Sequence, residues 1–157
     1  MNSMFSDVLN RLQPYTPGEQ LNDKRYIKLN TNENPYPPSK NTLDAIRANT
    51  GESLRLYPDP SCKELTAALA EKHSVGLDMI FVSNGSDELL AFAFNAFFAQ
   101  KTVSFPKITY SFYPVYCKLY DVAADIMDMD EDYSIDKEAM SRNSNPLIIA
   151  NPNAPTG

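Results

Sequence analysis

The sequence is poor in the residues on which several common kinds of site depend. It has five glycines, and neither the G-x-G-x-x-G pattern of dinucleotide-binding loops nor the G-x-x-x-x-G-K pattern of ATP-binding loops occurs. His73 is the only histidine, and since it has neither a second histidine nor a triad arrangement beside it, we expect no catalytic role for it. The two cysteines, Cys62 and Cys117, have no C-x-x-C spacing, which indicates reduced, packed thiols and not a disulfide framework.

Long apolar runs and a basic charge excess are also missing. No stretch is long enough to span a bilayer, and no basic-then-apolar leader opens the chain. A net charge of −6 argues against a nucleic-acid surface, because a polyanion attracts clustered lysine and arginine. Hydrophobic residues make up 43% of the chain and charged residues 22%, as in ordinary globular domains. We therefore expect a cytoplasmic protein with neither a membrane nor a nucleic acid as partner.

Prolines and capping residues divide the chain. Residues 1–28 are polar and predict an arm with one short helix at 5–12. Residues 29–60 contain five prolines, which interrupt regular structure around a predicted helix at 42–48. Ser61, with Glu64 three residues later, forms a capping-box pattern for a helix that runs to about His73.

From residue 79 onward, strand and helix patterns alternate. Short apolar runs predict strands at 79–82, 102–105, 122–127 and 147–150. Helices are predicted at 86–98, 110–120 and 136–141, and the first of these is apolar nearly all round, which is typical of a sandwiched helix. This alternation predicts an α/β fold with a mostly parallel sheet and flanking helices.

The turn Ser83-Asn84-Gly85-Ser86-Asp87-Glu88 lies between a predicted strand and a predicted helix. Gly85 permits a tight turn, and the N–H groups that follow it have no partner within the helix, so they can bind an anion. The Ser86 hydroxyl adds another donor. The alternative is ordinary capping, in which Ser86 or Asp87 satisfies the helix's own N–H groups.

Five segments, in order, resemble pyridoxal-phosphate (PLP) aminotransferases of fold type I similar to histidinol-phosphate aminotransferase. Gly85-Ser86-Asp87-Glu88 resembles the cradle for the PLP phosphate in that family. The other four are Leu29-Asn30-Thr31-Asn32-Glu33-Asn34-Pro35, Arg55-Leu56-Tyr57-Pro58-Asp59, Pro106-Lys107-Ile108-Thr109-Tyr110-Ser111 and Asn151-Pro152-Asn153-Ala154-Pro155-Thr156-Gly157. The resemblance implies that residues 29–157 are the first part of the PLP-binding large domain, with the remainder of that domain absent from this chain.

The same resemblance implies a role for individual residues. The N–H groups of Ser86 and Asp87, after Gly85, would hold the PLP phosphate, and Tyr110 would stack on the pyridine ring. Tyr57 would reach the phosphate bound by a partner subunit, which implies a homodimer. The substrate side of the pocket would include Tyr15, Asn32 and Glu33.

The terminal turn departs from the family pattern. Many relatives carry asparagine directly before Pro-Thr-Gly, where its amide donates to the phenolic oxygen of PLP, and Ala154 stands there in this chain. Alanine cannot donate that hydrogen bond, so either Asn153 or a water would cover the oxygen, or the electronics of the cofactor differ.

The family's Schiff-base lysine lies beyond the terminal turn, so the resemblance leaves no catalytic residue in this chain. We therefore expect the front part of an aminotransferase, inactive alone, whose complete enzyme transfers the amino group of histidinol phosphate to 2-oxoglutarate in histidine biosynthesis. Its small-molecule partners would be an amino-acid phosphate and a 2-oxo acid, and no metal is expected. Two alternatives stay open: an enzyme like threonine-phosphate decarboxylase, or a non-catalytic phosphate-binding or assembly fragment.

Overall fold

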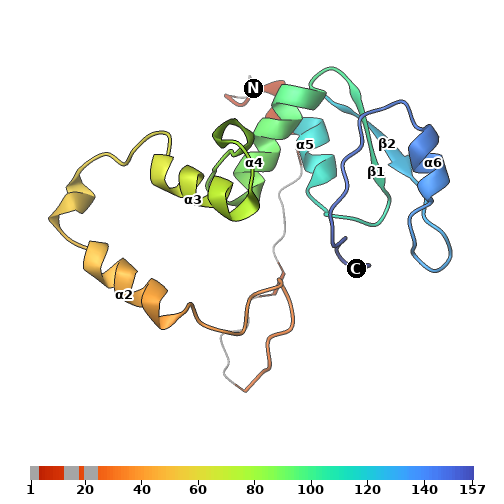
Figure 1. Cartoon of the computed structure of the whole chain (residues 1–157). Coiled ribbons are helices and arrows are strands. Elements are labelled where there is room, and N and C mark those ends of the chain that lie inside the picture. The colour runs from red at the N-terminus through yellow and green to blue at the C-terminus, as the bar shows by residue number, and fades with distance from the viewer. Residues whose placement is uncertain (1–3, 13–17, 20–24) are drawn as a thin grey trace. The chain divides into compact units, whose positions relative to one another are not determined.

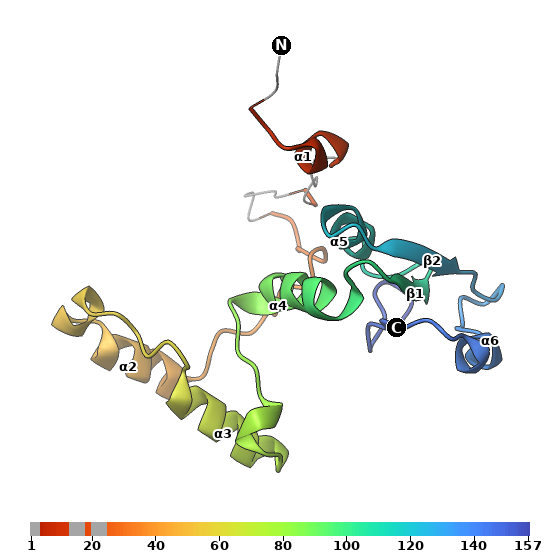
Figure 2. The ribbon, with the colours of Figure 1, turned by 90° about the horizontal axis from the view of Figure 1, so that it is seen from above.

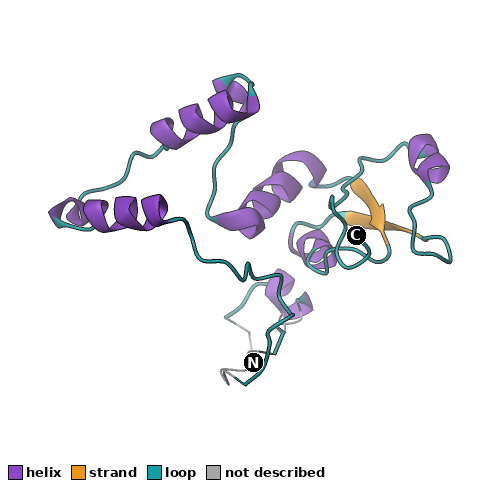
Figure 3. Cartoon of the chain, turned by 60° about the horizontal axis from the view of Figure 1, so that its bottom comes forward, coloured by secondary structure: helices purple, strands orange, loops and turns teal. Residues whose placement is uncertain are grey.

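The computed structural model of the chain describes residues 4–12, 18–19 and 25–157, and only the backbone of Arg11. Contacts group the chain into two compact units. The sheet unit comprises Met1–Gln13 and Ser83–Gly157, and the helical unit comprises Pro14–Val82. In the described residues, both strands belong to the sheet unit, whereas the helical unit holds helices and loops (Figure 3). The chain thus changes unit twice, between Gln13 and Pro14 and between Val82 and Ser83.

Two parallel strands form the centre of the sheet unit. β1 (Thr102–Pro106) pairs with β2 (Ala123–Met127) in a register that runs from Thr102↔Ala123 to Pro106↔Met127. α5 (Tyr113–Leu119) connects the two strands, as a parallel pair requires (Figure 1). Every residue of β1 except the first is buried, which fits an apolar strand covered on both faces. The predicted parallel α/β arrangement is therefore confirmed.

The strand predicted at 147–150 is reduced to a single contact. Leu147 makes one isolated parallel bridge to Ser104, on the opposite side of β1 from β2. The backbone N–H of Ile148 donates to the Ser104 carbonyl at 3.0 Å, and the N–H of Ser104 donates to the Pro146 carbonyl at 2.9 Å. The pairing of this segment with β1 ends soon after Leu147, because the chain enters the turn that contains Pro152, and proline has no N–H to donate.

The core of the sheet unit lies between α4, α5 and β1. α4 (Gly85–Ala93) continues into a π-helical turn at Phe94–Phe98, which replaces the uninterrupted α-helix that we predicted. The ring of Phe94, which is fully buried, lies 5.2 Å from the rings of both Phe98 and Tyr116. Buried residues of this core are Phe94, Val103, Phe105, Tyr113, Tyr116, Cys117 and Val122.

A polar cluster ties the loop after α6 (Lys137–Arg142) to the sheet. Ser104 is fully buried, and its hydroxyl donates to the Asp125 carboxylate at 2.6 Å. The side-chain amides of Asn143 and Asn145 donate to the same carboxylate oxygen at 3.0 and 3.2 Å. These hydrogen bonds, with that from Ser104 the strongest, lower the pKa of Asp125. The cluster therefore fixes the path of the chain on its way to the terminal turn.

Short helices stand at both ends of the sheet unit. α6 begins as predicted, because the Asp136 carboxylate accepts the N–H groups of Glu138 and Ala139 at 3.0 and 2.9 Å. α1 (Asp7–Arg11) is shorter than the predicted helix and contacts α5 (Figure 2). No helix within the described ranges has the length and apolar character needed to cross a bilayer.

The helical unit contains α2 (Lys40–Asn49), α3 (Lys63–His73) and two 3-10 turns, at Glu52–Arg55 and Leu77–Met79. Ser39 caps α2 by accepting the N–H of Thr42 at 3.2 Å. The capping box predicted for α3 is wrong: the helix begins at Lys63, and the Asp59 carboxylate accepts the N–H groups of Ser61 and Lys63 at 3.1 and 2.9 Å. A carboxylate is a stronger acceptor than a serine hydroxyl, which explains the difference.

The strand predicted at 79–82 is also wrong. A strand needs a neighbour to accept and donate its backbone hydrogen bonds, and the described residues pair no strand with this segment. Ala70 is the one buried hydrophobic residue of the described part of this unit. The unit exposes many large apolar side chains, among them those of Leu29, Leu54, Tyr57, Leu65, Leu77, Met79 and Phe81.

Candidate active site

The start of α4 is an open turn built on Gly85. Its φ of +81° is in the left-handed region that favours glycine, and a Cβ at this position would meet nothing within 4 Å. The Ser83 hydroxyl donates to the Gly85 carbonyl at 2.8 Å, and the Glu88 carboxylate accepts the N–H of Asn84 at 2.7 Å. The local chain thus stabilises the turn that precedes the helix.

The N-cap residue of α4, Asn84, makes no capping hydrogen bond through its side chain, and no side chain of the described residues accepts the N–H groups of Ser86 or Asp87. In an α-helix the first N–H groups have no acceptor one turn earlier, so those of Ser86 and Asp87 remain as donors at the positive end of the helix dipole. Since α4 has nine residues and an uncapped start, this turn has the donor set that binds a phosphate or carboxylate. The capping alternative, in which Ser86 or Asp87 would take up these N–H groups, is wrong here.

The Asp87 carboxylate accepts hydrogen bonds from two tyrosines. The Tyr110 hydroxyl donates to Oδ1 of Asp87 at 2.6 Å. The Tyr116 hydroxyl lies 3.0 Å from the backbone carbonyl of Asp87 and 3.3 Å from Oδ1. Burial raises the pKa of Tyr116 to about 12, and the negative charge of Asp87 adds to the effect. These contacts connect the start of α4 with Tyr110 and with α5.

Neighbouring aromatic rings hold Tyr110. Its ring centroid lies 6.2 Å from that of Phe112 with an angle of 28° between the planes, and 5.6 Å from that of Tyr113 in an edge-to-face arrangement. Both geometries are favourable for aromatic pairs. The ring is therefore oriented by the segment that leads into α5 as well as by Asp87.

The terminal turn joins this region through Asn153, which is buried. Its amide nitrogen donates to the Ile108 carbonyl at 2.9 Å and to the Thr156 hydroxyl at 2.7 Å. Its amide oxygen accepts the Thr109 hydroxyl at 2.8 Å. Both hydrogens of the amide are thus used within the chain, which leaves none for the cofactor oxygen that the sequence analysis considered. Asn153 instead holds the terminal turn beside the residue that precedes Tyr110.

The structure brings five of the predicted site residues into one unit: Gly85, Ser86, Asp87, Tyr110 and Asn153. Thr109 and Tyr116 also belong to this region, and neither was predicted from the sequence. Thr109 lies inside a motif that was singled out, so the motif was a signal for it. Tyr116 offered none, because its partner Asp87 is 29 residues earlier in the chain.

Tyr57, Asn32 and Glu33 belong to the helical unit. Tyr57 is fully exposed within the described residues, and Asn32 has a left-handed φ of 53°. The Glu33 carboxylate pairs with Lys28, whose hydrogen bond lowers the pKa of Glu33. Tyr15 lies outside the described residues.

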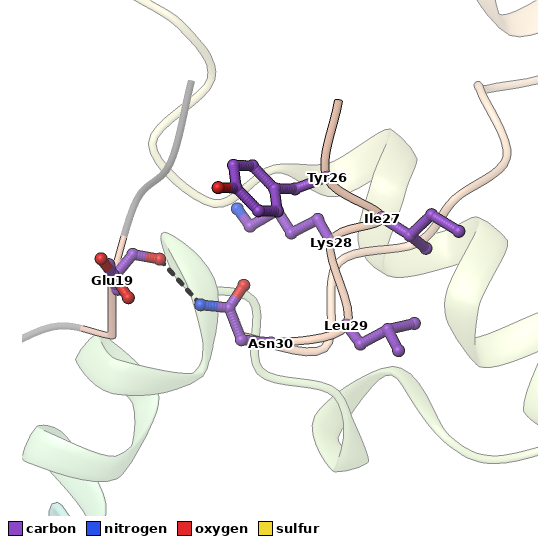
Figure 4. Close-up of a pocket in the computed structure, with 6 residues that line it drawn as sticks. All are labelled: Glu19, Tyr26, Ile27, Lys28, Leu29 and Asn30. Atoms are coloured by element: carbon purple, nitrogen blue, oxygen red, sulfur yellow. Dashed lines mark hydrogen bonds between the residues drawn. The ribbon is translucent and has the colours of Figure 1, made fainter. Parts of the chain in front are cut away.

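A pocket of about 360 Å³ lies in the same unit (Figure 4). Asn30 contributes to its wall and donates its amide to the Glu19 carbonyl at 2.7 Å. None of the predicted site residues that the structure describes is among those that line this pocket. Its lining consists of Glu19, Tyr26, Ile27, Lys28, Leu29 and Asn30.

Comparison with known proteins assigns the family. A family model described as aminotransferase class I and II matches residues 24–157. Histidinol-phosphate aminotransferase 1 of Methylococcus capsulatus is 51% identical over 158 residues, and the histidinol-phosphate aminotransferase of Clostridium beijerinckii is 46% identical. Both alignments include all of this chain, which spans 44% of the length of each relative.

A solved structure agrees with this result. This is a crystal structure from Erwinia carotovora atroseptica, of a protein assigned provisionally as a histidinol-phosphate aminotransferase. It matches with a TM-score of 0.71 and 27% sequence identity, and the match covers 82% of this chain and 39% of that one. The sheet unit is thus part of a fold type I large domain, as the motifs predicted. The family generally depends on PLP. By its motifs, its fold and these relatives, the chain belongs to the aminotransferase class I and II family.

Proposed function

We propose that this chain supplies the phosphate side of the PLP site in an aminotransferase that acts on histidinol phosphate with 2-oxoglutarate. The observation that carries the proposal is the start of α4, where uncapped N–H groups stand beside an Asp87 carboxylate that bonds to Tyr110 and Tyr116 instead. The substrate is proposed because relatives that align with the whole chain have the name histidinol-phosphate aminotransferase.

The residues at α4 fit a phosphate monoester. The N–H groups of Ser86 and Asp87 and the Ser86 hydroxyl would donate to its oxygens, and Gly85 leaves open the space that a side chain would occupy. The Tyr110 ring would stack on the pyridine ring and set its plane. Asn153 would act indirectly, by holding the terminal turn against Ile108 and Thr109. When bound, PLP supplies the electron sink for amino-group transfer.

Further roles are proposed on the resemblance. Tyr57 would contact the phosphate bound by the partner subunit of a homodimer, and its full exposure leaves its hydroxyl accessible for that contact. Tyr15, Asn32 and Glu33 would lie on the substrate side. Residues 1–28 would act as an arm and residues 29–157 as the first part of the large domain, in a cytoplasmic enzyme. No catalytic lysine is assigned within residues 1–157.

A chimeric enzyme tests the proposal. Residues 1–157 would be joined to the remaining part of the Methylococcus capsulatus relative, and the product assayed with 2-oxoglutarate and histidinol phosphate, threonine phosphate or phenylalanine. We expect transamination of histidinol phosphate, because a substrate phosphate adds charge-assisted hydrogen bonds that phenylalanine lacks. The same chimera with Ser86→Pro, which removes both the N–H and the hydroxyl that Ser86 would donate, should lose PLP affinity.

Other outcomes would change the assignment. Carbon dioxide release from threonine phosphate would identify a decarboxylase, and turnover of phenylalanine alone would overturn both phosphate-substrate functions. A chimera that folds and binds PLP equally well with and without Ser86→Pro would show that the phosphate lies elsewhere.

A further inference from the structure

We propose that Tyr116 is a positioning residue for the anion site at α4. With Tyr110, it holds the Asp87 carboxylate away from the first-turn N–H groups, which leaves those groups available to a phosphate. This inference rests on the proposed function, because it concerns the same turn.

Asp87 stands where its own carboxylate could block the site. A carboxylate in the first turn of a helix is attracted by the positive end of the dipole and can accept the N–H groups there. Among the described residues no side chain accepts the N–H groups of Ser86 or Asp87, and Oδ1 of Asp87 accepts from Tyr110 at 2.6 Å and from Tyr116 at 3.3 Å. The two hydroxyls thus take the place of the helix N–H groups as donors to this carboxylate.

Tyr116 is the more firmly held of the two tyrosines. It is 3% exposed, and its ring lies 5.2 Å from the rings of both Phe94 and Phe112. Its hydroxyl also contacts the backbone carbonyl of Asp87, at 3.0 Å. Because the core fixes this ring, its hydroxyl has a fixed position from which it contacts both the side chain and the backbone of Asp87. Tyr110 is only partly buried.

Loss of the Tyr116 hydroxyl would return the carboxylate to the helix. The N–H groups of α4 are the alternative donors, and a carboxylate that accepts them competes with a phosphate for the same hydrogens and repels its charge. Phosphate binding should therefore weaken because Asp87 moves. A merely structural role of Tyr116 would instead weaken binding through damage that a change at Asp87 cannot repair.

The test uses the 157-residue chain and three variants: Tyr116→Phe, Tyr116→Phe with Asp87→Ala, and Tyr113→Phe as the matched control. Tyr113 lies one turn earlier on α5 and is also buried, and none of its described hydrogen bonds joins it to Asp87. The first measurement, without ligand, is amide hydrogen exchange at Ser86 and Asp87. The second is the affinity for inorganic phosphate.

We expect Tyr116→Phe to slow exchange at Ser86 and Asp87 and to weaken phosphate binding about three- to tenfold, the effect of one net hydrogen bond. Adding Asp87→Ala should restore both values, since it removes the competing carboxylate and keeps the backbone N–H. Tyr113→Phe should match the wild type in both measurements.

Several results would overturn the inference. These are unchanged exchange in Tyr116→Phe, a loss of affinity that Asp87→Ala does not restore, or an equal effect of Tyr113→Phe. If Tyr116→Phe does not fold, the Asp87→Ala variant decides by itself, with exchange rates corrected for intrinsic rates. Faster exchange at Ser86 in this variant would mean that the Asp87 carboxylate already caps α4 in the wild type, which overturns the proposal. An unchanged rate supports the proposal. A wild-type chain that binds no phosphate would reject the proposed function, whereas the exchange measurements still judge Tyr116.

Discussion

Asn153 donates its side-chain amide to the backbone carbonyl of Ile108 at 2.9 Å, although the two residues are 45 positions apart in the chain. The bond connects the terminal turn with the segment that carries Thr109 and Tyr110. Since Asn153 is 5% exposed, water does not readily replace this partner. The terminal turn is thus held by a buried hydrogen bond and not by its own prolines alone.

Asn153→Ala should destabilise the sheet unit by about 2 kcal/mol, because it leaves the Ile108 carbonyl and the Thr109 hydroxyl unpaired. Urea denaturation followed by circular dichroism measures the loss. Asn95→Ala is the control, since Asn95 is exposed in the same unit and should cost little. Equal stability of the two variants would mean that Asn153 does not hold the turn.

Gly85→Ala should cost about 1 kcal/mol, because a Cβ strains the left-handed backbone even where space is open. The control is Gly51→Ala, at an extended φ of −170° and also with nothing within 4 Å. Only the first variant should lower the urea midpoint. A comparable loss at Gly51 would show that the general effect of replacing glycine, and not the positive φ, sets the cost.

Stability should fall in acid through Asp125. The pKa of Asp125 is lowered in the folded state, chiefly by the Ser104 hydrogen bond. The ionised carboxylate therefore stabilises the fold at pH values above its ordinary pKa. This contribution is lost as the pH falls through the lowered folded-state pKa. Asp125→Asn should therefore be less stable than the wild type at neutral pH, with a difference that shrinks in acid. Melting temperatures from pH 2 to 7 test this. Glu131→Gln, at an exposed residue of the following loop, should keep the wild-type profile.

The two cysteines should react at very different rates. Cys117 is buried, and burial raises its pKa to about 11, so at pH 8 only about one molecule in a thousand carries the thiolate, whereas Cys62 is exposed. With Ellman's reagent, Cys117→Ser should react rapidly through Cys62, and Cys62→Ser should react at least about 100-fold more slowly until denatured. Similar rates in the two variants would contradict the buried placement.

Local sequence signals predicted much of the fold. Strands β1 and β2 were predicted to within about one residue, since each is a short apolar run with a helix pattern beside it. The helices predicted at 42–48 and 136–141 also occur, as α2 and α6, with ends that differ by one or two residues. The cap predicted at Ser61 failed because two nearby side chains competed as acceptors for the N–H groups at the start of the helix. The strand predicted at 79–82 failed because a strand needs a neighbour that is distant in the sequence.

The sequence by itself determined the family and the position of the open turn at Gly85, because ordered motifs and a glycine directly before a helix pattern need no knowledge of distant contacts. Only the tertiary structure decided where the side chains around that turn point. Asp87 could have capped its own helix, and the core that packs Tyr116 against Phe94 presents hydroxyl donors to it instead. Asn153 could have faced a ligand, but it is buried beside Ile108, and its side-chain amide donates to that residue's carbonyl instead. Hydrogen bonds between residues dozens of positions apart depend on packing, which no local pattern encodes.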